Sequence, residues 1–314
     1  MKLSVVIPSY NEEGNVIPIY ESLSKVLDNI DYELIYVDDG SKDKTFVELQ
    51  EVYNRDMDHV KVVSFSRNFG KEAAMYAGLS HASGEYTCII DGDMQQNPSY
   101  LIEMMNFLDE NPNYDQVAMV MKKRKVDSLL MRICKKAFYR LIDKISDIHF
   151  ENGASDFRMF RRTVTNVIVN LSEKNRFSKG IFAWIGFNTK YMEYEVQPRL
   201  NGESNFNFSV SFRYALDGIL GYSVKPLRIS TYIGVISSIA AFIYAIVIII
   251  QKLGWGIAVS GYASLICVIL FLGGIQLITI GILGEYLAKT YLETKNRPIY
   301  VVRKSFGFED DNIL

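Results

Sequence analysis

The stretch Ile89-Ile90-Asp91-Gly92-Asp93-Met94-Gln95 places two acidic residues directly after an apolar run. The run over residues 86–90 is rich in β-branched side chains and predicts a buried strand, and Asn97-Pro98 breaks the chain soon afterwards. If the alternation of the strand continues, Asp91 and Asp93 point to the same side. Carboxylate oxygens there suit Mg²⁺ or Mn²⁺ that also holds a diphosphate, although an isolated Asp-x-Asp is more often a solvated turn.

The same succession of apolar run, polar turn and helical pattern occurs three times before this strand. Strands are expected over residues 3–7, 32–37 and 60–64, and helices over 16–27, 46–53 and 72–81. Such alternation predicts an α/β fold with a mostly parallel sheet and right-handed crossovers. Ligands of such sheets bind beyond the carboxyl ends of the strands, where every polar turn of this region falls.

Three ordered motifs resemble those of the inverting glycosyltransferases of family 2. They are Pro8-Ser9-Tyr10-Asn11-Glu12, Asp38-Asp39-Gly40-Ser41 and Asp91-Gly92-Asp93-Met94-Gln95. The later motifs resemble the polyprenyl-phosphate branch, which includes bactoprenol glucosyltransferases and relatives of dolichol-phosphate mannose synthase. The resemblance covers nearly the whole chain. It implies a GT-A type nucleotide-sugar-binding domain, followed by interfacial helices and a two-helix transmembrane hairpin.

The resemblance also implies a pocket for the nucleotide. Pro8, Tyr10 and Glu12 would line the site of the base and ribose, and Asp39, possibly with Asp38, would hydrogen-bond the base. A carboxylate can accept from the N–H of uracil, and a tyrosine ring can stack on it. Ordinary packing is the alternative for Tyr10, and helix capping is the alternative for the two aspartates.

At the metal, the resemblance makes Asp93 the principal ligand, with Asp91 on the ribose or the metal and Gln95 assisting. The expected cofactor is Mg²⁺ or Mn²⁺. Arg67 and Lys71 are candidates to face phosphate, and a solvated basic turn is the competing interpretation.

A second cluster is Gly153-Ala154-Ser155-Asp156-Phe157-Arg158, interpreted as a polar segment between two helix-like stretches. In the family, the aspartate here lies near the acceptor and is the candidate catalytic base. Because a lipid phosphate is already ionised near neutral pH, positioning and charge neutralisation by Asp156 should matter more than proton removal. A buried salt bridge to Arg158 or another cation is the structural alternative.

The segment over residues 197–206 resembles the family's Arg-x-x-Gly-x-Ser-Lys segment, which closes over the diphosphate. Arg199 fits an anion clamp, whereas Asn205 stands where the family has a lysine. Met121 is a second departure, near a position where relatives often carry an arginine. The residues expected at the lipid phosphate are Arg124, Arg132, Arg158 and Ser204.

Several segments predict a membrane protein. Apolar and basic residues recur at helical spacing over 128–145, which indicates an interfacial amphipathic helix or, alternatively, core packing, and 206–224 has a similar pattern. Uncharged apolar stretches over 229–250 and 262–283 are long enough to span the membrane as a hairpin. Basic residues flank the outer ends of the hairpin, so the positive-inside rule places the catalytic domain and both termini in the cytoplasm of a bacterial cell, with the hairpin in the plasma membrane.

The predicted organisation is a catalytic domain over 1–205, an interfacial segment over 206–227, the hairpin region over 228–284 and a cytoplasmic tail over 285–314. The formal net charge of −2 and the mean hydropathy of +0.06 fit an average of a polar domain and an apolar hairpin. Three cysteines without metal-like spacing predict neither a disulfide nor a metal site. The basic patches lack nucleic-acid motifs, so no nucleic-acid partner is expected.

The predicted reaction is an inverting transfer of one sugar, glucose or N-acetylglucosamine, from a UDP-sugar to undecaprenyl phosphate. The product would serve cell-envelope glycan modification. A GDP-mannose-dependent polyprenyl-phosphate mannosyltransferase and a catalytically silent membrane scaffold are the alternatives. A processive polysaccharide synthase is disfavoured because two helices are too few for a monomeric channel. The resemblance further implies a homo-oligomer, with a tetramer favoured.

Overall fold

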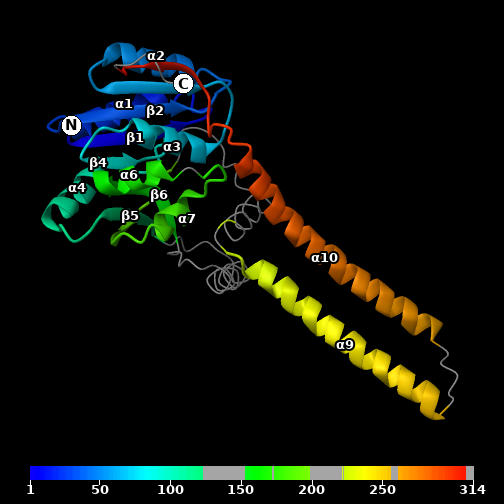
Figure 1. Ribbon diagram of the computed structural model, residues 1–314. Helices are drawn as coiled ribbons and strands as arrows, with labels where there is room; N and C mark the ends of the chain where they lie inside the picture. Colours follow the sequence, from blue (N-terminus) through cyan, green and yellow to red (C-terminus); the bar gives the residue numbers. More distant parts are fainter. Residues whose placement is uncertain (123–152, 172, 199–220, 222, 256–260, 309–314) are drawn as a thin grey trace.

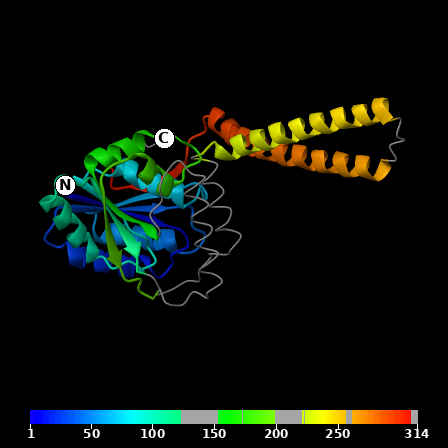
Figure 2. The same cartoon turned by 90° about the horizontal axis from the view of Figure 1, so that it is seen from below.

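The computed structural model describes residues 1–122, 153–171, 173–198, 221, 223–255 and 261–308. Figure 1 shows a twisted sheet with helices on both faces, from which two long helices extend to one side. The same helices form a projecting arm in the turned view (Figure 2). The predicted α/β fold with a mostly parallel sheet and an apolar helical hairpin is confirmed.

The eight strands of the sheet are ordered β7-β5-β6-β4-β1-β2-β3-β8. Strands β1 to β4 pair in parallel, as do β5 and β7, whereas β6 and β8 each run antiparallel to their neighbours. The strands are β1 (Leu3–Ser9), β2 (Tyr32–Asp38), β3 (Val60–Phe65), β4 (Tyr86–Ile89), β5 (Gln116–Met121), β6 (Ala154–Arg161), β7 (Thr189–Tyr194) and β8 (Val302–Phe306).

Two helical layers bury the two faces of the sheet. One layer holds α1 (Val16–Leu27), α2 (Thr45–Arg55) and α4 (Tyr100–Glu110), and the other holds α3 (Lys71–His81), α6 (Arg162–Asn170) and α7 (Ser178–Trp184). Alternation along the strands supplies both cores: Val5 of β1 packs toward the first layer and Val6 toward the second. Gly78 lets α3 approach β1 closely, because a Cβ there would collide with the side chain of Val6.

The first four strands and the first three helices lie where the sequence predicted them, with ends that differ by one or two residues. One interpretation was wrong: the segment around Asp156 is not a polar connection but strand β6, paired on both sides. The polar residues Ser155, Asp156 and Arg158 conceal the alternating pattern by which a strand is recognised in sequence. Phe157 and Met159 enter the first core, whereas Phe160 enters the second.

The two apolar helices are longer than the predicted spans. Helix α9 covers Lys225–Trp255 and α10 covers Tyr262–Thr294, and both have the length and composition to cross a membrane. The extra length of α10 contains the charged residues Glu285, Lys289 and Glu293 and reaches back to the α/β domain (Figure 1). The predicted interfacial helices over 128–145 and most of 206–224 lie outside the described residues.

The chain after α10 returns to the sheet, which the sequence did not predict. Strand β8 pairs antiparallel with β3, and Phe306 places its ring 5.6 Å from that of Tyr53 and 6.2 Å from that of Phe46. The return covers the edge of β3 that would otherwise present unpaired backbone groups. The chain that follows α10 is therefore attached to the α/β domain.

We expect Phe306→Ala to destabilise the domain, because it removes a half-buried ring from the contact with α2. The expected cost is about 2 kcal/mol, or an apparent Tm lowered by about 5 °C in a thermal melt. Val301→Ala is the matched control, since Val301 is an exposed residue of the same segment. An unchanged Tm in Phe306→Ala would contradict a stabilising role for the returning strand.

Candidate functional site

Three charged side chains meet where β4 ends. The ammonium of Lys71, in the first turn of α3, lies 2.5 Å from Oδ1 of Asp91 and 3.2 Å from Oδ2 of Asp156. Asp91 follows β4, and Asp156 lies near the start of β6. Because β4 and β6 are antiparallel, with Ile89 opposite Arg158, the end of one strand lies beside the beginning of the other. The sheet thus brings together aspartates that are 65 residues apart in sequence.

The charges of this cluster stabilise one another. Burial would raise the pKa of Asp156, but Lys71, Lys179 and Arg158 together hold it below its usual value. Burial would likewise lower the pKa of Lys71, but Asp91 and Asp156 hold it above its usual value. Asp156 is therefore ionised and Lys71 protonated across the neutral range. A carboxyl group with a lowered pKa is a weak base, which favours a role in positioning and charge balance.

Asp156 retains one acceptor for a ligand. Its side chain is 15% exposed, and Oδ2 is the oxygen that faces Lys71. Within the part of the chain that the structure describes, Oδ1 is buried and has no hydrogen-bond partner. An unsatisfied buried carboxylate oxygen is costly and marks a position where a bound group can donate.

Asp38 and Asp39 hold the loops at the ends of β2 and β3. Asp38 accepts from the Ser41 backbone N–H at 2.9 Å and from Ser64 Oγ at 2.7 Å. Asp39 accepts from the backbone N–H groups of Phe69 at 2.6 Å and Gly70 at 2.9 Å. Burial raises the pKa of Asp39, and these two donors offset part of the rise. Both aspartates thus have structural partners, and their predicted contact with the base stays a prediction.

The bond from Asp39 matters for the cluster because Gly70 immediately precedes Lys71 and α3. Gly40 allows the approach: its φ is +64°, and a Cβ there would collide with the backbone of Arg67. The Asp39 turn therefore fixes where α3 begins and where the Lys71 side chain emerges.

The loop predicted to contact the nucleotide adjoins this turn. Tyr10 is 40% exposed, as a stacking ring requires. Pro8 ends the apolar part of β1, opposite Val37, and Glu12 accepts from Asn15 Nδ2 at 2.6 Å. The Glu12 backbone N–H donates to Thr45 Oγ1 at 2.7 Å, which ties the loop to α2. The structure places these side chains at the carboxyl ends of the strands, as expected.

The turn over residues 91–95 departs from the predicted alternation. Strand β4 ends at Ile89, and Met94 adopts a left-handed φ of 59°, so the directions of Asp91 and Asp93 are set by a turn. Asp91 Oδ2 accepts from Gln96 Nε2 at 2.9 Å, in addition to the Lys71 contact of Oδ1. Asp93 Oδ1 accepts from the backbone N–H of Gln95 at 3.1 Å.

These donors fit a divalent cation that is shared with a diphosphate. Among the described residues, no group of three or more His, Cys, Asp or Glu side chains is placed to hold a metal ion alone. Asp91, Asp93 and the Gln95 amide offer hard oxygens, which Mg²⁺ and Mn²⁺ prefer, and phosphate oxygens would complete the coordination.

The segment that leads to Arg199 begins beside this turn. Gln197 donates its backbone N–H to Gln95 O at 3.0 Å, and Gln95 Nε2 donates to Gln197 O at 3.3 Å. Arg199, Ser204 and Asn205 lie outside the described residues, as do Arg124 and Arg132. The pairing with Gln95 agrees with the expectation that the segment closes near the diphosphate.

Arg158, which was expected to contact the lipid phosphate, is not exposed to solvent as such a ligand would be. It is buried, its Nε donates to Ser155 O at 3.4 Å, and its guanidinium lies 5.0 Å from the ring centroid of Phe182. Sequence reasoning did not single out Lys179, whose charge acts on Asp156. Only the folded sheet shows that α7 lies near β6, so no local motif signalled this residue.

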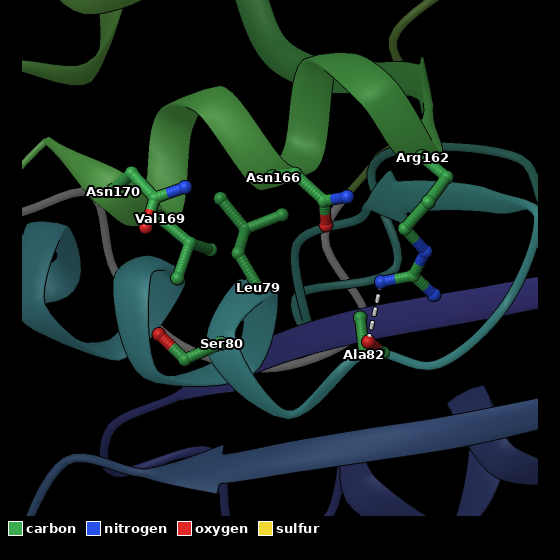
Figure 3. Close-up of a pocket in the computed structure, with 7 residues that line it drawn as sticks. All are labelled: Leu79, Ser80, Ala82, Arg162, Asn166, Val169 and Asn170. Atoms are coloured by element: carbon green, nitrogen blue, oxygen red, sulfur yellow. Dashed lines mark hydrogen bonds between the residues drawn. The ribbon is translucent and has the colours of Figure 1, made fainter.

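Two cavities flank the helical layers. One of about 240 Å³ adjoins the Asp38 turn and includes Arg303 of β8, so the returning strand reaches the nucleotide side of the sheet. The other, of about 300 Å³, lies between the end of α3 and α6 (Figure 3). Arg162 crosses its edge and donates to Ala82 O. Since Lys71 is at the opposite end of α3, about 15 Å away along the helix, this cavity is separate from the charged cluster.

Two protein-family models match this chain. Residues 4–169 match the model of glycosyl transferase family 2, and residues 225–290 match that of the GtrB C-terminal hairpin. A putative glycosyltransferase, CsbB of Bacillus subtilis, is 42% identical over 306 residues, covering 96% of this chain and 92% of that protein.

The SfII prophage-derived bactoprenol glucosyl transferase of Shigella flexneri is 41% identical over 309 residues, covering 97% of this chain and 98% of that protein. A solved structure of glucosyl-3-phosphoglycerate synthase from Mycobacterium tuberculosis, with Mn²⁺ and UDP-glucose, is 19% identical. Its match covers 70% of this chain and 77% of that chain, with a TM-score of 0.48. By its family match and its full-length relatives, the chain belongs to glycosyltransferase family 2.

Proposed function

We propose that this protein transfers glucose from UDP-glucose to undecaprenyl phosphate, with inversion at the anomeric carbon. The observation that carries the proposal is the Lys71 bridge between Asp91 and Asp156, at the sheet edge where family motifs converge. The named activity of the bactoprenol glucosyl transferases, about 40% identical over almost their whole length, supports this donor and acceptor.

The donor nucleotide would bind across the ends of β1 and β2. Tyr10 would stack on the base, Asp39 would accept from it, and Pro8 and Glu12 would line the ribose site. Asp39 can do so while it holds the loop before α3, because each carboxylate oxygen has two lone pairs. Arg199 would clamp the diphosphate from the segment that begins at Gln197.

A divalent metal would be held by Asp93, with Asp91 and Gln95 beside it. When bound, Mg²⁺ or Mn²⁺ would supply positive charge to the departing diphosphate. The chain contributes a turn whose shape is set by Gln96 and by the left-handed Met94. Lys71 holds Asp91 in place and adds a positive charge close to the same leaving group.

The lipid phosphate would approach from the side of Asp156. Lys71 and Lys179 offset the repulsion between the carboxylate and the acceptor, and the acceptor needs no proton removed at neutral pH. Oδ1 of Asp156 would accept from a sugar hydroxyl and orient the anomeric carbon. Arg124, Arg132 and Ser204 remain proposed contacts of the lipid phosphate, and buried Arg158 would act there only through its charge.

The two apolar helices and the membrane relatives support attachment to the membrane. Within the proposal, the protein lies in the bacterial plasma membrane with the catalytic domain and both termini in the cytoplasm, where nucleotide-sugars occur. Assembly as a tetramer stays a prediction, to be checked by cross-linking in membranes.

The first test uses full-length protein with undecaprenyl phosphate and radiolabelled UDP- and GDP-sugars, with and without Mn²⁺. UDP-glucose with metal is expected to give one lipid product that is labile to mild acid. Asp93→Ala should reduce its formation at least about a hundredfold, because the leaving group loses its charge partner. Asp58→Ala, an exposed acidic control, should behave as wild type. A product with GDP-mannose alone, or no lipid product, would contradict the proposal.

Lys71→Met should move the acidic limb of the kcat profile to higher pH. Lys71 keeps the pKa of Asp156 low, so the ionised carboxylate is lost only as pH falls through that low value. Without the ammonium, burial dominates and the pKa rises. Lys122→Met, which breaks an exposed ion pair with Glu195, should leave the profile unchanged. An unshifted profile in Lys71→Met would remove the cluster from the mechanism.

Metal affinity should depend on nucleotide. Because the described residues hold no three-ligand cluster, Mn²⁺ alone should bind weakly in calorimetry, and UDP should tighten it by about a hundredfold or more. Equal Mn²⁺ affinity with and without UDP would indicate a metal site built by protein alone.

A further inference from the structure

The cytoplasmic end of α10 is bonded to the catalytic domain. Oε1 of Glu293, one residue before the end of α10, accepts from the backbone N–H groups of Lys174 at 2.8 Å and Asn175 at 3.1 Å. These amides belong to the connection between α6 and α7, in which we term residues 173–177 the docking loop. A carboxylate that accepts two backbone N–H bonds is a strong and directional contact.

The buried guanidinium of Arg176 bonds the docking loop to the end of α6. This buried residue donates to Leu171 O at 2.6 Å and to Ile168 O at 3.3 Å. Its guanidinium also lies 4.3 Å from the ring centroid of Tyr76 in α3. Arg176 therefore ties the loop to the end of α6 and to α3, and the loop leads directly into Ser178, the first residue of α7.

Ser178 connects the docking loop to the charged cluster. Its backbone N–H donates to Oε2 of Glu72 at 2.8 Å, and its hydroxyl donates to the same oxygen. Glu72 lies in the first turn of α3 and follows Lys71 directly. Lys71 in turn joins Asp91 and Asp156. Polar contacts, connected by the chain between Asn175 and Ser178 and between Lys71 and Glu72, therefore link α10 to the charged cluster.

We propose that Glu293 is a positioning residue, through which the seated membrane helix holds Lys71 between Asp91 and Asp156. The inference rests on the proposed transfer to a membrane-embedded lipid phosphate. Seating of α10 keeps the docking loop in place, the loop keeps Ser178 on Glu72, and Glu72 keeps the first turn of α3 in position. The lipid phosphate would reach the site from the membrane. A contact with α10 would therefore position Lys71 on the side from which the lipid approaches.

The base and ribose contacts are held by bonds that do not involve Glu293. Tyr10 and Asp39 belong to the loops after β1 and β2, which are bonded to each other and to the residues before α3. Loss of the Glu293 bonds should therefore impair transfer more than UDP binding, to which Lys71 contributes only at the diphosphate. A purely structural role would reduce stability, nucleotide binding and transfer together.

The variants for the test are Glu293→Ala, Glu293→Gln and Glu285→Ala in full-length protein in nanodiscs. Alanine removes the acceptor of both loop amides, whereas glutamine retains an Oε1 that can accept them. Glu285 is an exposed acidic residue on the same helix and serves as the matched control.

Amide hydrogen exchange tests the series of contacts without any substrate. In Glu293→Ala, exchange at the amide of Ser178, which is bonded to Glu72 and not to Glu293, should accelerate by about tenfold. The amides of Lys174 and Asn175 should accelerate as well. Glu293→Gln and Glu285→Ala should match wild type. Acceleration confined to Lys174 and Asn175 would overturn the proposal, because the disturbance would not reach α7.

Kinetics test the consequence for catalysis. Glu293→Ala should lower kcat/KM for undecaprenyl phosphate by about tenfold, while its Kd for UDP with Mn²⁺ rises by less than about threefold, because the base and ribose contacts are retained. Glu293→Gln should restore transfer. Unchanged transfer in Glu293→Ala, or an equal loss of UDP affinity and transfer, would contradict a positioning role.

The two measurements also separate this inference from the proposed function. If wild-type protein forms no lipid-linked sugar, the proposed reaction fails, and exchange at Ser178 alone decides whether the membrane helix positions the cluster. If wild type is active but Ser178 exchange and transfer are unchanged in Glu293→Ala, the reaction stands and the positioning role fails.

Discussion

The contact of the Lys71 ammonium with two carboxylates is the interaction on which the site depends. Asp91 follows β4 and Asp156 lies in its antiparallel neighbour β6, and burial would make Asp156 costly to keep ionised without a cation. Lys71 reaches both only because α3 begins at this edge, in the position that Asp39 and Gly40 give it. The positions of Asp91 and Asp156 therefore depend on the Lys71 ammonium and on the Asp39-Gly40 turn that places it.

The charges of Lys71, Asp91 and Asp156 suit the transfer of a sugar to a phosphate. Donor diphosphate and acceptor phosphate are both anionic, so positive charge between them lowers the repulsion that would keep them apart. Proton removal contributes little, because the acceptor is ionised and the pKa of Asp156 is low. Orientation and electrostatics then remain as the contributions that the protein can make.

Sequence reasoning found the elements whose signals are local. The strand before Asp91, the Asp38-Asp39-Gly40 turn and the helices after the first strands follow from apolar periodicity and from turn residues. It misjudged β6, because Ser155, Asp156 and Arg158 conceal the alternation of a strand that is buried on both sides. For Lys71 it offered a phosphate contact or a solvated basic turn and did not foresee the bridge between two aspartates. It also passed over Lys179, Glu293 and β8. Those roles arise from contacts between residues distant in sequence, for which periodicity carries no information.

The decisive measurement is a structure of the full-length protein with UDP-glucose bound. We expect the diphosphate to lie beside Asp93 and within hydrogen-bonding reach of Lys71, with the anomeric carbon facing Asp156. A nucleotide bound in the cavity between α3 and α6, or a sugar placed away from the Lys71 cluster, would contradict it.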